Sequence, residues 1–368
     1  METIVIIGGG IVGLSIAREL AETNRGDEIF LLEQEAFLGH HTTGRNSEVL
    51  HAGVAYPPHS LKTKLCVEGN ILTYELAERL NIPLKKTGKW ILATNDAEAE
   101  GLEKLARNVV ESGAVPLVPH DPQDAVDDVP ELKLSRACMF APSTGMLDCA
   151  GYVQALDRHL AAFENVYVIR ECCVKSIDAA KSILHTNRDD IPYDFLINSA
   201  GLWADEVYAM AGGQRKFQII PYRGEYYRWK KATLEHVIYP VPARFVNGGD
   251  GSMISSLGIH VHRNYGGEVL LGPSHICGDV ACKTDYAITT PPQVFIDAIA
   301  PFMKQPPTLD EVEMAYAGNR PKLFEDGKAI GDFVIFKEGN IVHLLGIESP
   351  GLTAAPAIGR YVADLLRH

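Results

Sequence analysis

An α/β fold divided between two domains is predicted by three features of the sequence. Thr3 to Ile7 is a short run of β-branched residues, which is typical of a buried parallel strand. Glycines and a helical apolar pattern from Leu14 to Leu20 follow it. From Phe217 onward, short strand patterns separated by turns predict a mostly antiparallel sheet. The length of 368 residues exceeds one typical core, so each sheet is expected to form its own domain.

The glycines after the first strand match a dinucleotide-binding fingerprint. Gly8, Gly10 and Gly13 fit G-x-G-x-x-G, in which the glycines allow a tight turn, a close pyrophosphate and close packing of helix on strand. The helix start at Ile11 and Val12 would offer free N–H groups to the phosphates. The order of strand, motif and helix favours a Rossmann-like domain over a glycine-rich turn in an ordinary α/β protein.

A second strand is predicted from Glu28 to Leu32, and Glu33 follows at its tip. A carboxylate there can hold the ribose hydroxyls of NAD or FAD, and it would repel the 2′-phosphate of NADP. The polar loop from His40 to Gly53 mixes small hydroxyl residues with Arg and Asn, which suits contacts to a phosphate or a flavin ring; the alternative is a surface loop that caps the next helix. The candidate cofactor contacts in this stretch are Gln34, Thr42, Thr43, Arg45, Asn46 and Ser47.

The rest of the chain alternates between helix and strand patterns. Helices are expected over 61–80, 96–112, 151–163 and 354–366, and Lys62 near the start of the first is expected to be solvated. Strands are expected over 88–94, 166–174, 195–201, 219–229, 237–242, 257–263, 268–273, 334–336 and 341–345. The segment 116–134 is predicted to be irregular, and the segment 140–148 is predicted to form a turn. Further cofactor candidates at the ends of two strands are Val174, Ala200, Gly201 and Trp203.

The last glycine-rich loop precedes the final helix. A strand, a loop and a helix start again form an anion-binding arrangement, now near the C-terminus. Its candidate cofactor contacts are Gly346, Ile347, Glu348, Ser349, Pro350, Gly351, Leu352 and Thr353.

Composition limits the class of protein. The formal net charge of -13 argues against nucleic acid and against broad attachment to anionic lipid. No apolar run approaches the roughly 18 residues of a membrane span, and the first strand begins too early for a leader, so we expect a cytoplasmic protein, with peripheral contact at the inner membrane left open. The seven cysteines match no zinc pattern, and no metal is expected.

Ten segments spread over the whole chain carry a family resemblance. They are Gly8–Gly13, Glu33, Arg45–Gly53, Ser60–Cys66, Pro142–Asp148, Asn198–Gly201, Ile238–Pro242, Gly258–His260, Gly318–Lys322 and Gly346–Thr353. Together they resemble the D-amino-acid-oxidase-like family of FAD-dependent oxidoreductases. The resemblance implies an FAD-binding domain from 1–85, 140–215 and 325–368 and a substrate-binding domain from 86–139 and 216–324. It also implies non-covalent FAD, with His40 and His41 as the covalent alternatives.

The resemblance implies oxidation of a small 2-hydroxy acid such as L-2-hydroxyglutarate, with oxygen or a quinone as electron acceptor. The second possible function is oxidation of an amine, an amino acid or glycerol 3-phosphate by an enzyme of the same fold. The third is a non-catalytic nucleotide-binding module. The flavin would take the hydride, and a histidine of near-neutral pKa would take the hydroxyl proton. His260 is the first candidate for this base, with His262 as support, and His51 would lie beside the flavin.

The carboxylate of the substrate requires a fixed cation. Arg320 is the first candidate because a planar guanidinium can grip a carboxylate in two places, and it is expected in a polar break after a strand-like stretch. Arg223 and Lys322 are the next candidates, and Tyr239 could add a hydroxyl donor. A surface ion pair is the ordinary alternative for Arg320.

Overall fold

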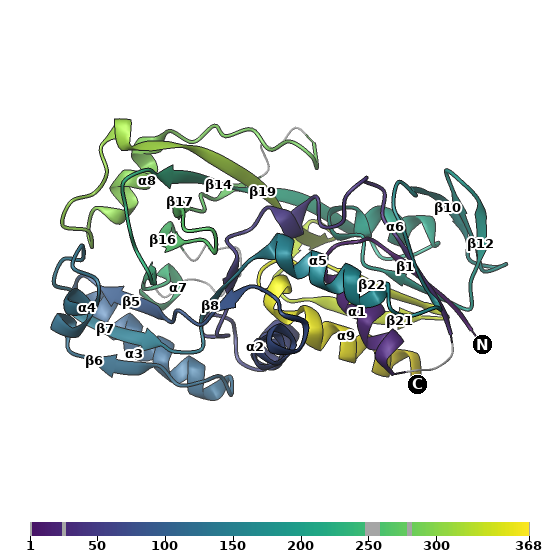
Figure 1. The fold of residues 1–368 in the computed structure, drawn as a ribbon, viewed down its shortest axis with the longest axis horizontal. Coiled ribbons are helices and arrows are strands. Elements are labelled where there is room, and N and C mark those ends of the chain that lie inside the picture. The colour runs from purple at the N-terminus through teal and green to yellow at the C-terminus, as the bar shows by residue number, and fades with distance from the viewer. Residues whose placement is uncertain (1, 24–26, 247–257, 278–281, 368) are drawn as a thin grey trace.

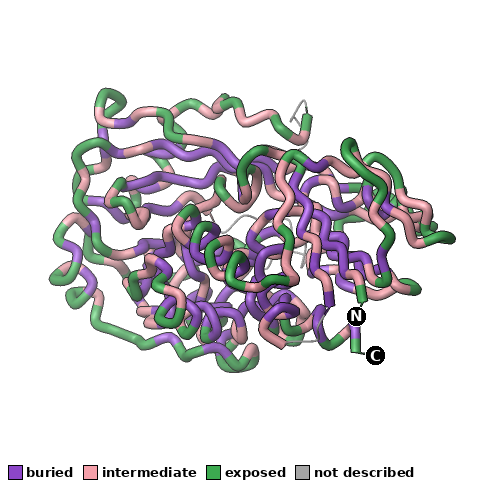
Figure 2. Tube along the Cα trace, turned by 45° about the vertical axis from the view of Figure 1, so that its right-hand side comes forward, coloured by how far each residue is buried: buried purple, intermediate pink, exposed green. Residues whose placement is uncertain are grey.

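Two β-sheets lie at the centre of the computed structural model, which describes residues 2–23, 27–246, 258–277 and 282–367 (Figure 1). One sheet is mostly parallel and the other mostly antiparallel. Buried residues run through the middle of both sheets, whereas the outer loops are largely exposed (Figure 2). The α/β class with two kinds of sheet is therefore confirmed.

The parallel sheet has β1 near its centre. Ile4 and Ile6 face one side of this sheet and Val5 and Ile7 face the other, as the two-residue period of a strand requires. Its strands, in spatial order, are β21 (Val334–Glu338), β22 (Ile341–Leu345), β13 (Phe195–Asn198), β1 (Thr3–Ile7), β2 (Glu28–Leu32) and β9 (Val166–Ile169). Only β21 runs antiparallel to its neighbour.

Helices cover one face of the parallel sheet, and a small sheet covers the other. The helices are α1 (Ile11–Glu22), α2 (Leu61–Leu80), α5 (Cys149–Leu160) and α9 (Gly351–Arg367), and they share a core with Ile4 and Ile6. The small sheet consists of β10 (Val174–Asp178), β11 (Ile183–Thr186) and β12 (Asp190–Pro192). No described helix combines the length and apolar character that crossing a lipid bilayer requires.

The second sheet joins strands from distant parts of the chain. In spatial order they are β20 (Lys328–Ile330), β19 (Val312–Glu325), β14 (Phe217–Trp229), β17 (Val269–Gly272), β16 (His260–Arg263), β15 (Val237–Pro240), β5 (Lys89–Ala93), β7 (Ala137–Ala141) and β6 (Val118–His120). In addition, β18 (Ile276–Cys277) pairs with β14. Among the described strands of this sheet, only β15 and β5 pair in parallel.

Short elements complete the described chain. The helices are α3 (Asp96–Glu111), α4 (Pro122–Asp128), α6 (Ala204–Met210), α7 (Ala243–Val246) and α8 (Pro292–Ile299), with 3-10 turns η1 (Thr42–Gly44), η2 (Gly201–Trp203) and η3 (Leu309–Glu311). A third small sheet holds β3 (Val49–Leu50), β8 (Gly145–Leu147) and β4 (Leu84–Lys85).

Several expected elements differ from those observed. The segment 116–134 contains β6 and α4, because Asp121 caps a helix that starts at Pro122. The turn expected over 140–148 contains the end of β7 and all of β8. The strand expected over 166–174 is two strands in different sheets, separated where Glu171 adopts a positive φ of 55°. The polar break around Arg320 is the interior of β19, where pairing with β14 overrides local polarity.

The hairpin expected over 257–273 is present as the antiparallel pair β16 and β17. Leu257, its first expected residue, lies outside the described residues. Lys62, which was expected to be solvated, is buried at 4 % exposure.

Close packing of α2 on α9 generates a stability prediction. A Cβ on Gly69 would lie 2.3 Å from the Thr353 carbonyl oxygen, so Gly69→Ala should destabilise the protein by about 1–3 kcal/mol. The same change in an unobstructed helix would instead stabilise it by up to about 1 kcal/mol. Urea unfolding measures the difference. Glu75→Ala places an alanine at an exposed site of α2 and should stay within about 0.5 kcal/mol of the native protein.

Candidate active site

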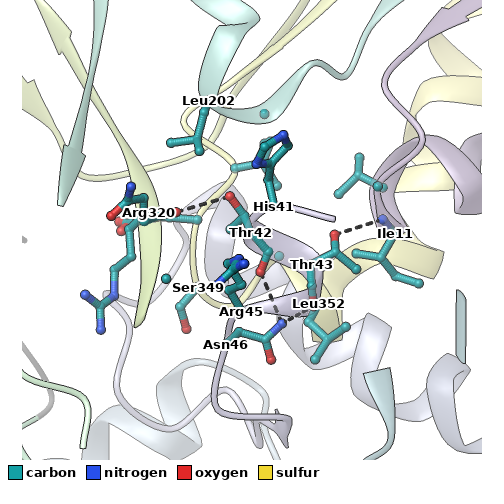
Figure 3. Close-up of a pocket in the computed structure, with 18 of the residues that line it drawn as sticks. Ile11, His41, Thr42, Thr43, Arg45, Asn46, Leu202, Arg320, Ser349 and Leu352 are labelled. Atoms are coloured by element: carbon teal, nitrogen blue, oxygen red, sulfur yellow. Dashed lines mark hydrogen bonds between the residues drawn. The ribbon is translucent and has the colours of Figure 1, made fainter. Parts of the chain in front are cut away.

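A cavity of about 650 Å³ lies where the two sheets meet. This volume is within the roughly 300–1,000 Å³ of small-molecule sites. Its lining includes the starts of α1 and α9, the loop around η1, and residues of β14, β15, β16 and β19. Segments that are far apart in sequence therefore face one space, as the close-up in Figure 3 shows for Ile11, Thr43, Arg320 and Leu352.

The turn from β1 to α1 is shaped by glycine. Gly8 has a φ of +111°, and a Cβ on Gly13 would lie 2.0 Å from the Gly8 carbonyl oxygen, so both positions require glycine. The start of α1 lines the cavity, where the Ile11 N–H donates to Thr43 Oγ1 at 3.1 Å. The next N–H groups have no acceptor within the helix, so the turn can bind an anion.

Glu33 is held at the tip of β2 by backbone donors. Its Oε2 accepts from the Gly9 N–H at 2.8 Å and its Oε1 from the Glu35 N–H at 2.9 Å. Burial raises its pKa, although these hydrogen bonds oppose the shift. The carboxylate therefore has a fixed orientation at the edge of the cavity, which suits binding of hydroxyl groups.

The loop around η1 is fixed by its own polar groups. Thr42 Oγ1 donates to the Asn319 carbonyl at 3.1 Å, and Asn46 Nδ2 donates to the Thr43 carbonyl at 2.5 Å (Figure 3). The Arg45 guanidinium lies 4.0 Å from the centre of the Tyr286 ring, and Arg45 Nε is buried without a hydrogen-bond partner among the described residues. A cation held in this way at the cavity can meet a negatively charged or aromatic group.

The C-terminal loop brings a second helix start to the same cavity. Ile347 to Leu352 line it, and α9 begins at Gly351. The loop is tied to the segment around β3, since the His51 N–H donates to Thr353 Oγ1 at 2.9 Å. Both glycine-rich helix starts therefore face one space.

Two histidines of the cavity are held in the neutral form. His260 stacks on Tyr239 with ring centres 3.9 Å apart, and burial and the nearby His262 lower the pKa of His260 well below 6.5. His51 Nε2 lies 3.3 Å from Ser349 Oγ, and burial and Lys89 lower the pKa of His51 to about 3. Both rings are therefore unprotonated at neutral pH, and their pKa values lie below the near-neutral value expected of the base from the sequence, because burial disfavours the charged ring.

His260 has one free ring nitrogen. Its Nδ1 lies 3.2 Å from the Gly258 carbonyl oxygen, which can only accept, so Nδ1 carries the proton in the neutral ring. Its Nε2 is buried and has no hydrogen-bond partner within the described ranges. This tautomer leaves a lone pair on Nε2, which is what a general base needs.

A buried ion triad borders the cavity beneath the C-terminal loop. Glu348 Oε1 accepts from Lys62 Nζ at 3.0 Å and from Lys322 Nζ at 2.7 Å. Burial alone would raise the pKa of Glu348, but the two ammonium groups outweigh it and keep the pKa below its usual value. The triad joins α2, β19 and the C-terminal loop and leaves one net positive charge at the cavity wall.

Most of the predicted site residues line the cavity, but five do not. Those that line it are His260, His51, Arg320, Tyr239, Lys322, Gly8, Gly10, Ile11, Val12, Glu33, Gln34, Thr42, Thr43, Arg45, Asn46, Ser47, Val174, Ala200, Gly201, Trp203, Ile347, Glu348, Ser349, Pro350, Gly351 and Leu352. The other five are Arg223, His262, Gly13, Gly346 and Thr353.

Arg223 is in the wrong place for a substrate ligand. Along β14, Gly224 and Tyr226 line the cavity, whereas Arg223 and Glu225 belong to the opposite face. Arg223 Nε donates to Glu225 Oε1 at 3.1 Å and Nη1 to Asp285 at 3.0 Å, so its charge is already matched. His262 is also fully buried, behind His260.

The sequence reasoning missed three basic side chains around the cavity. Arg244 of α7 and His275 line it directly. Lys89 of β5 is buried, its Nζ lies 4.5 Å from the centre of the Tyr239 ring, and burial lowers its pKa to about 8. Only Lys89 had a local signal, as a charged residue opening an apolar strand. The other two are brought in by tertiary structure.

The ion triad predicts a large effect of Glu348→Gln. Two buried ammonium groups would lose their counter-charge, so the free energy of unfolding should fall by about 3–5 kcal/mol. Lys322→Met should cost less because Glu348 keeps Lys62. The native protein should also lose stability as pH falls through the depressed pKa of Glu348, and the glutamine variant should lack this loss. Urea unfolding with and without saturating FAD tests both points; equal stability of the two variants would contradict the prediction.

Comparison with known proteins agrees with this geometry. The model of the FAD dependent oxidoreductase family matches residues 3–365. The chain is 31% identical to a glycerol 3-phosphate dehydrogenase of Caloramator mitchellensis, covering 100% of this chain and 74% of that protein, and 30% identical to the mitochondrial L-2-hydroxyglutarate dehydrogenase of Arabidopsis thaliana, covering 98% and 82%. The structure of FAD-bound L-alpha-glycerophosphate oxidase from Mycoplasma pneumoniae superposes with a TM-score of 0.82 at 24% identity, covering 100% and 96%.

The match over residues 3–365 includes both sheets and both glycine-rich helix starts. A dinucleotide cofactor fits the cavity, because glycines clear its phosphate-binding turn and a fixed carboxylate lies at its edge. The protein therefore belongs to the family of FAD-dependent oxidoreductases.

Proposed function

We propose that the protein oxidises a 2-hydroxy acid, L-2-hydroxyglutarate, to the 2-oxo acid. The observation that carries the proposal is a pair of buried polar atoms on one cavity. His260 Nε2 and Arg320 Nη1 both lack hydrogen-bond partners among the described residues, and both side chains line the cavity. A general base and a carboxylate-binding cation are what this reaction requires. The similarity to L-2-hydroxyglutarate dehydrogenases supports the same substrate.

The cofactor would be held non-covalently by the two helix starts. Gly8 to Val12 would bind the diphosphate and Glu33 the ribose hydroxyls, while Ile347 to Leu352 would meet the flavin ring. When bound, FAD supplies a two-electron acceptor for the hydride from the substrate. We further propose that residues 1–85, 140–215 and 325–368 form the cofactor-binding domain, and 86–139 and 216–324 the substrate-binding domain. Apart from β20, the last two residues of β7 and the last residue of β19, the strands of the mostly antiparallel sheet come from the second set.

His260 would take the hydroxyl proton at Nε2. The Gly258 carbonyl keeps the proton of the neutral ring on Nδ1, and stacking on Tyr239 fixes the plane of the ring. The C2 hydrogen leaves with its electron pair while the hydroxyl proton passes to Nε2. The C2–O single bond thereby becomes the C=O double bond of the 2-oxo acid. His51 would stay beside the flavin and help to exclude water.

Arg320 would bind the C1 carboxylate. It lines the cavity from β19, and no carboxylate among the described residues forms an ion pair with it. A bidentate contact would orient C2 toward the cofactor. Lys322 is committed to Glu348 and would contribute charge at a distance. We place the reaction in the cytoplasm, with oxygen or a quinone met at the membrane surface as acceptor.

The substrate proposal predicts which compounds bleach the flavin. Under anaerobic conditions L-2-hydroxyglutarate should reduce the bound FAD within seconds, whereas D-2-hydroxyglutarate, glycine and L-proline should not. Visible absorption follows the reduction. Glycerol 3-phosphate is the decisive comparison, since a relative named for its oxidation is 31% identical to the chain and an L-2-hydroxyglutarate dehydrogenase is 30% identical. Faster reduction by glycerol 3-phosphate than by L-2-hydroxyglutarate would overturn the proposal.

The depressed histidine pKa values predict the pH dependence. Because both histidines are neutral well below pH 6.5, the acidic limb of kcat/KM should lie below about pH 6. His260→Asn should lower kcat/KM by about 100-fold or more. Lys89→Met removes a nearby positive charge and should move the acidic limb upward. An acidic limb at pH 6.5 or above in the native enzyme would contradict the assignment.

A further inference from the structure

Arg244 is a further cavity cation without a carboxylate partner among the described residues. It lines the cavity from α7, and none of the ion pairs formed by the described residues includes it. Its Nη2 donates to Asn108 Oδ1 at 3.4 Å, a long contact, and its Nε is buried without a partner. Burial lowers the pKa of the Arg244 guanidinium, because removing the charged group from water is unfavourable. An anion bound next to Arg244 would offset this desolvation cost.

The surroundings of Arg244 hold it in a defined position. Its guanidinium lies 4.3 Å from the centre of the Phe245 ring, and α7 approaches α3 where a Cβ on Gly101 would lie 3.1 Å from the Phe245 carbonyl oxygen. Asn108 of α3 accepts from Arg244 and also donates to the Val54 and Tyr56 carbonyls. Arg244 is thus attached to the loop that carries Tyr56, which lines the same cavity.

Arg244 and Arg320 reach the cavity from different elements. Arg320 belongs to β19, whereas Arg244 follows β15 in the chain. β15 also contains Tyr239, whose ring stacks on that of His260. Arg45 also lines the cavity, but it comes from the loop around η1 beside the proposed cofactor contacts. Among the described residues, Arg244 and Arg320 are therefore the two guanidinium groups left for the substrate, and two such groups suit a substrate with two anionic groups better than a substrate with one. The charge of each would be matched only when both groups are bound.

We infer that Arg244 binds the distal carboxylate of the substrate and selects dicarboxylic over monocarboxylic 2-hydroxy acids. The inference rests on the proposed function, in which Arg320 binds the C1 carboxylate. A monocarboxylate of equal length would leave the half-buried Arg244 without a counter-charge, and a polar site rejects an analogue that lacks the matching group in this way.

Binding of two non-reacting ligands to the FAD-loaded enzyme tests the inference. The ligands are 2-oxoglutarate and 2-oxovalerate, which have five carbons each and differ in the distal carboxylate. Calorimetry and the perturbation of the flavin spectrum give the dissociation constants. In Arg244→Gln the constant for 2-oxoglutarate should rise by about 10- to 100-fold, and the ratio between the two ligands should collapse by a similar factor. Arg244→Lys should recover part of the ratio.

Arg136→Gln is the matched control, because Arg136 pairs with Asp96 on the exposed surface and does not line the cavity. It should leave the ratio unchanged. An equal loss for both ligands in Arg244→Gln, or no loss, would overturn the inference. Failure of the proposed function has a different signature: native enzyme that L-2-hydroxyglutarate does not reduce. Kinetics with L-2-hydroxyglutarate and L-2-hydroxyvalerate should show the same change of ratio in kcat/KM.

Discussion

Close contact of α9 with α1 and α2 is the constraint on which the cavity depends. A Cβ on Gly359 would lie 2.7 Å from the Ser15 carbonyl oxygen, and one on Gly69 would lie 2.3 Å from that of Thr353. Glycines therefore allow three helices to lie side by side on the parallel sheet. The starts of α1 and α9 consequently meet at the same edge, outside the carboxyl ends of β1 and β22, where ligands bind in open α/β sheets.

The opposite wall of the cavity carries uncompensated polar groups at a cost in stability. Burying a polar atom without a partner disfavours the folded state, and His260, Arg320 and Arg244 each include such an atom among the described residues. The neighbouring Lys62, Lys322 and Glu348 show the other solution, since their charges are satisfied within the protein. Unmatched and matched charges therefore lie close together, since Arg320 and Lys322 are two residues apart on β19 and both line the cavity.

The sequence predicted the side of the cavity formed by the parallel sheet better than the side formed by the mostly antiparallel sheet. Strand, glycine motif, helix and Glu33 are consecutive, so local pattern sufficed for them. Arg223 and Arg320 could not be distinguished, because the choice depends on which face of a long strand each occupies after β14 pairs with β19. Arg244 has no local signal, since it becomes part of the cavity only when β15 pairs with β5 and α7 packs on α3. The split strands at 166–178 depended on a single residue of positive φ.

The position of β22 and α9 within the sheet has a consequence for synthesis on the ribosome. β22 pairs with β13, and α9 lies against α1, so residues 341–367 complete the layer that residues 3–22 begin. A nascent chain that has reached β19 has most of its sheets but lacks the loop from Gly346 to Leu352 that borders the cavity. Cofactor capture would accordingly wait until this loop and α9 have been made, and flavin retention would distinguish chains that contain them from chains interrupted before them.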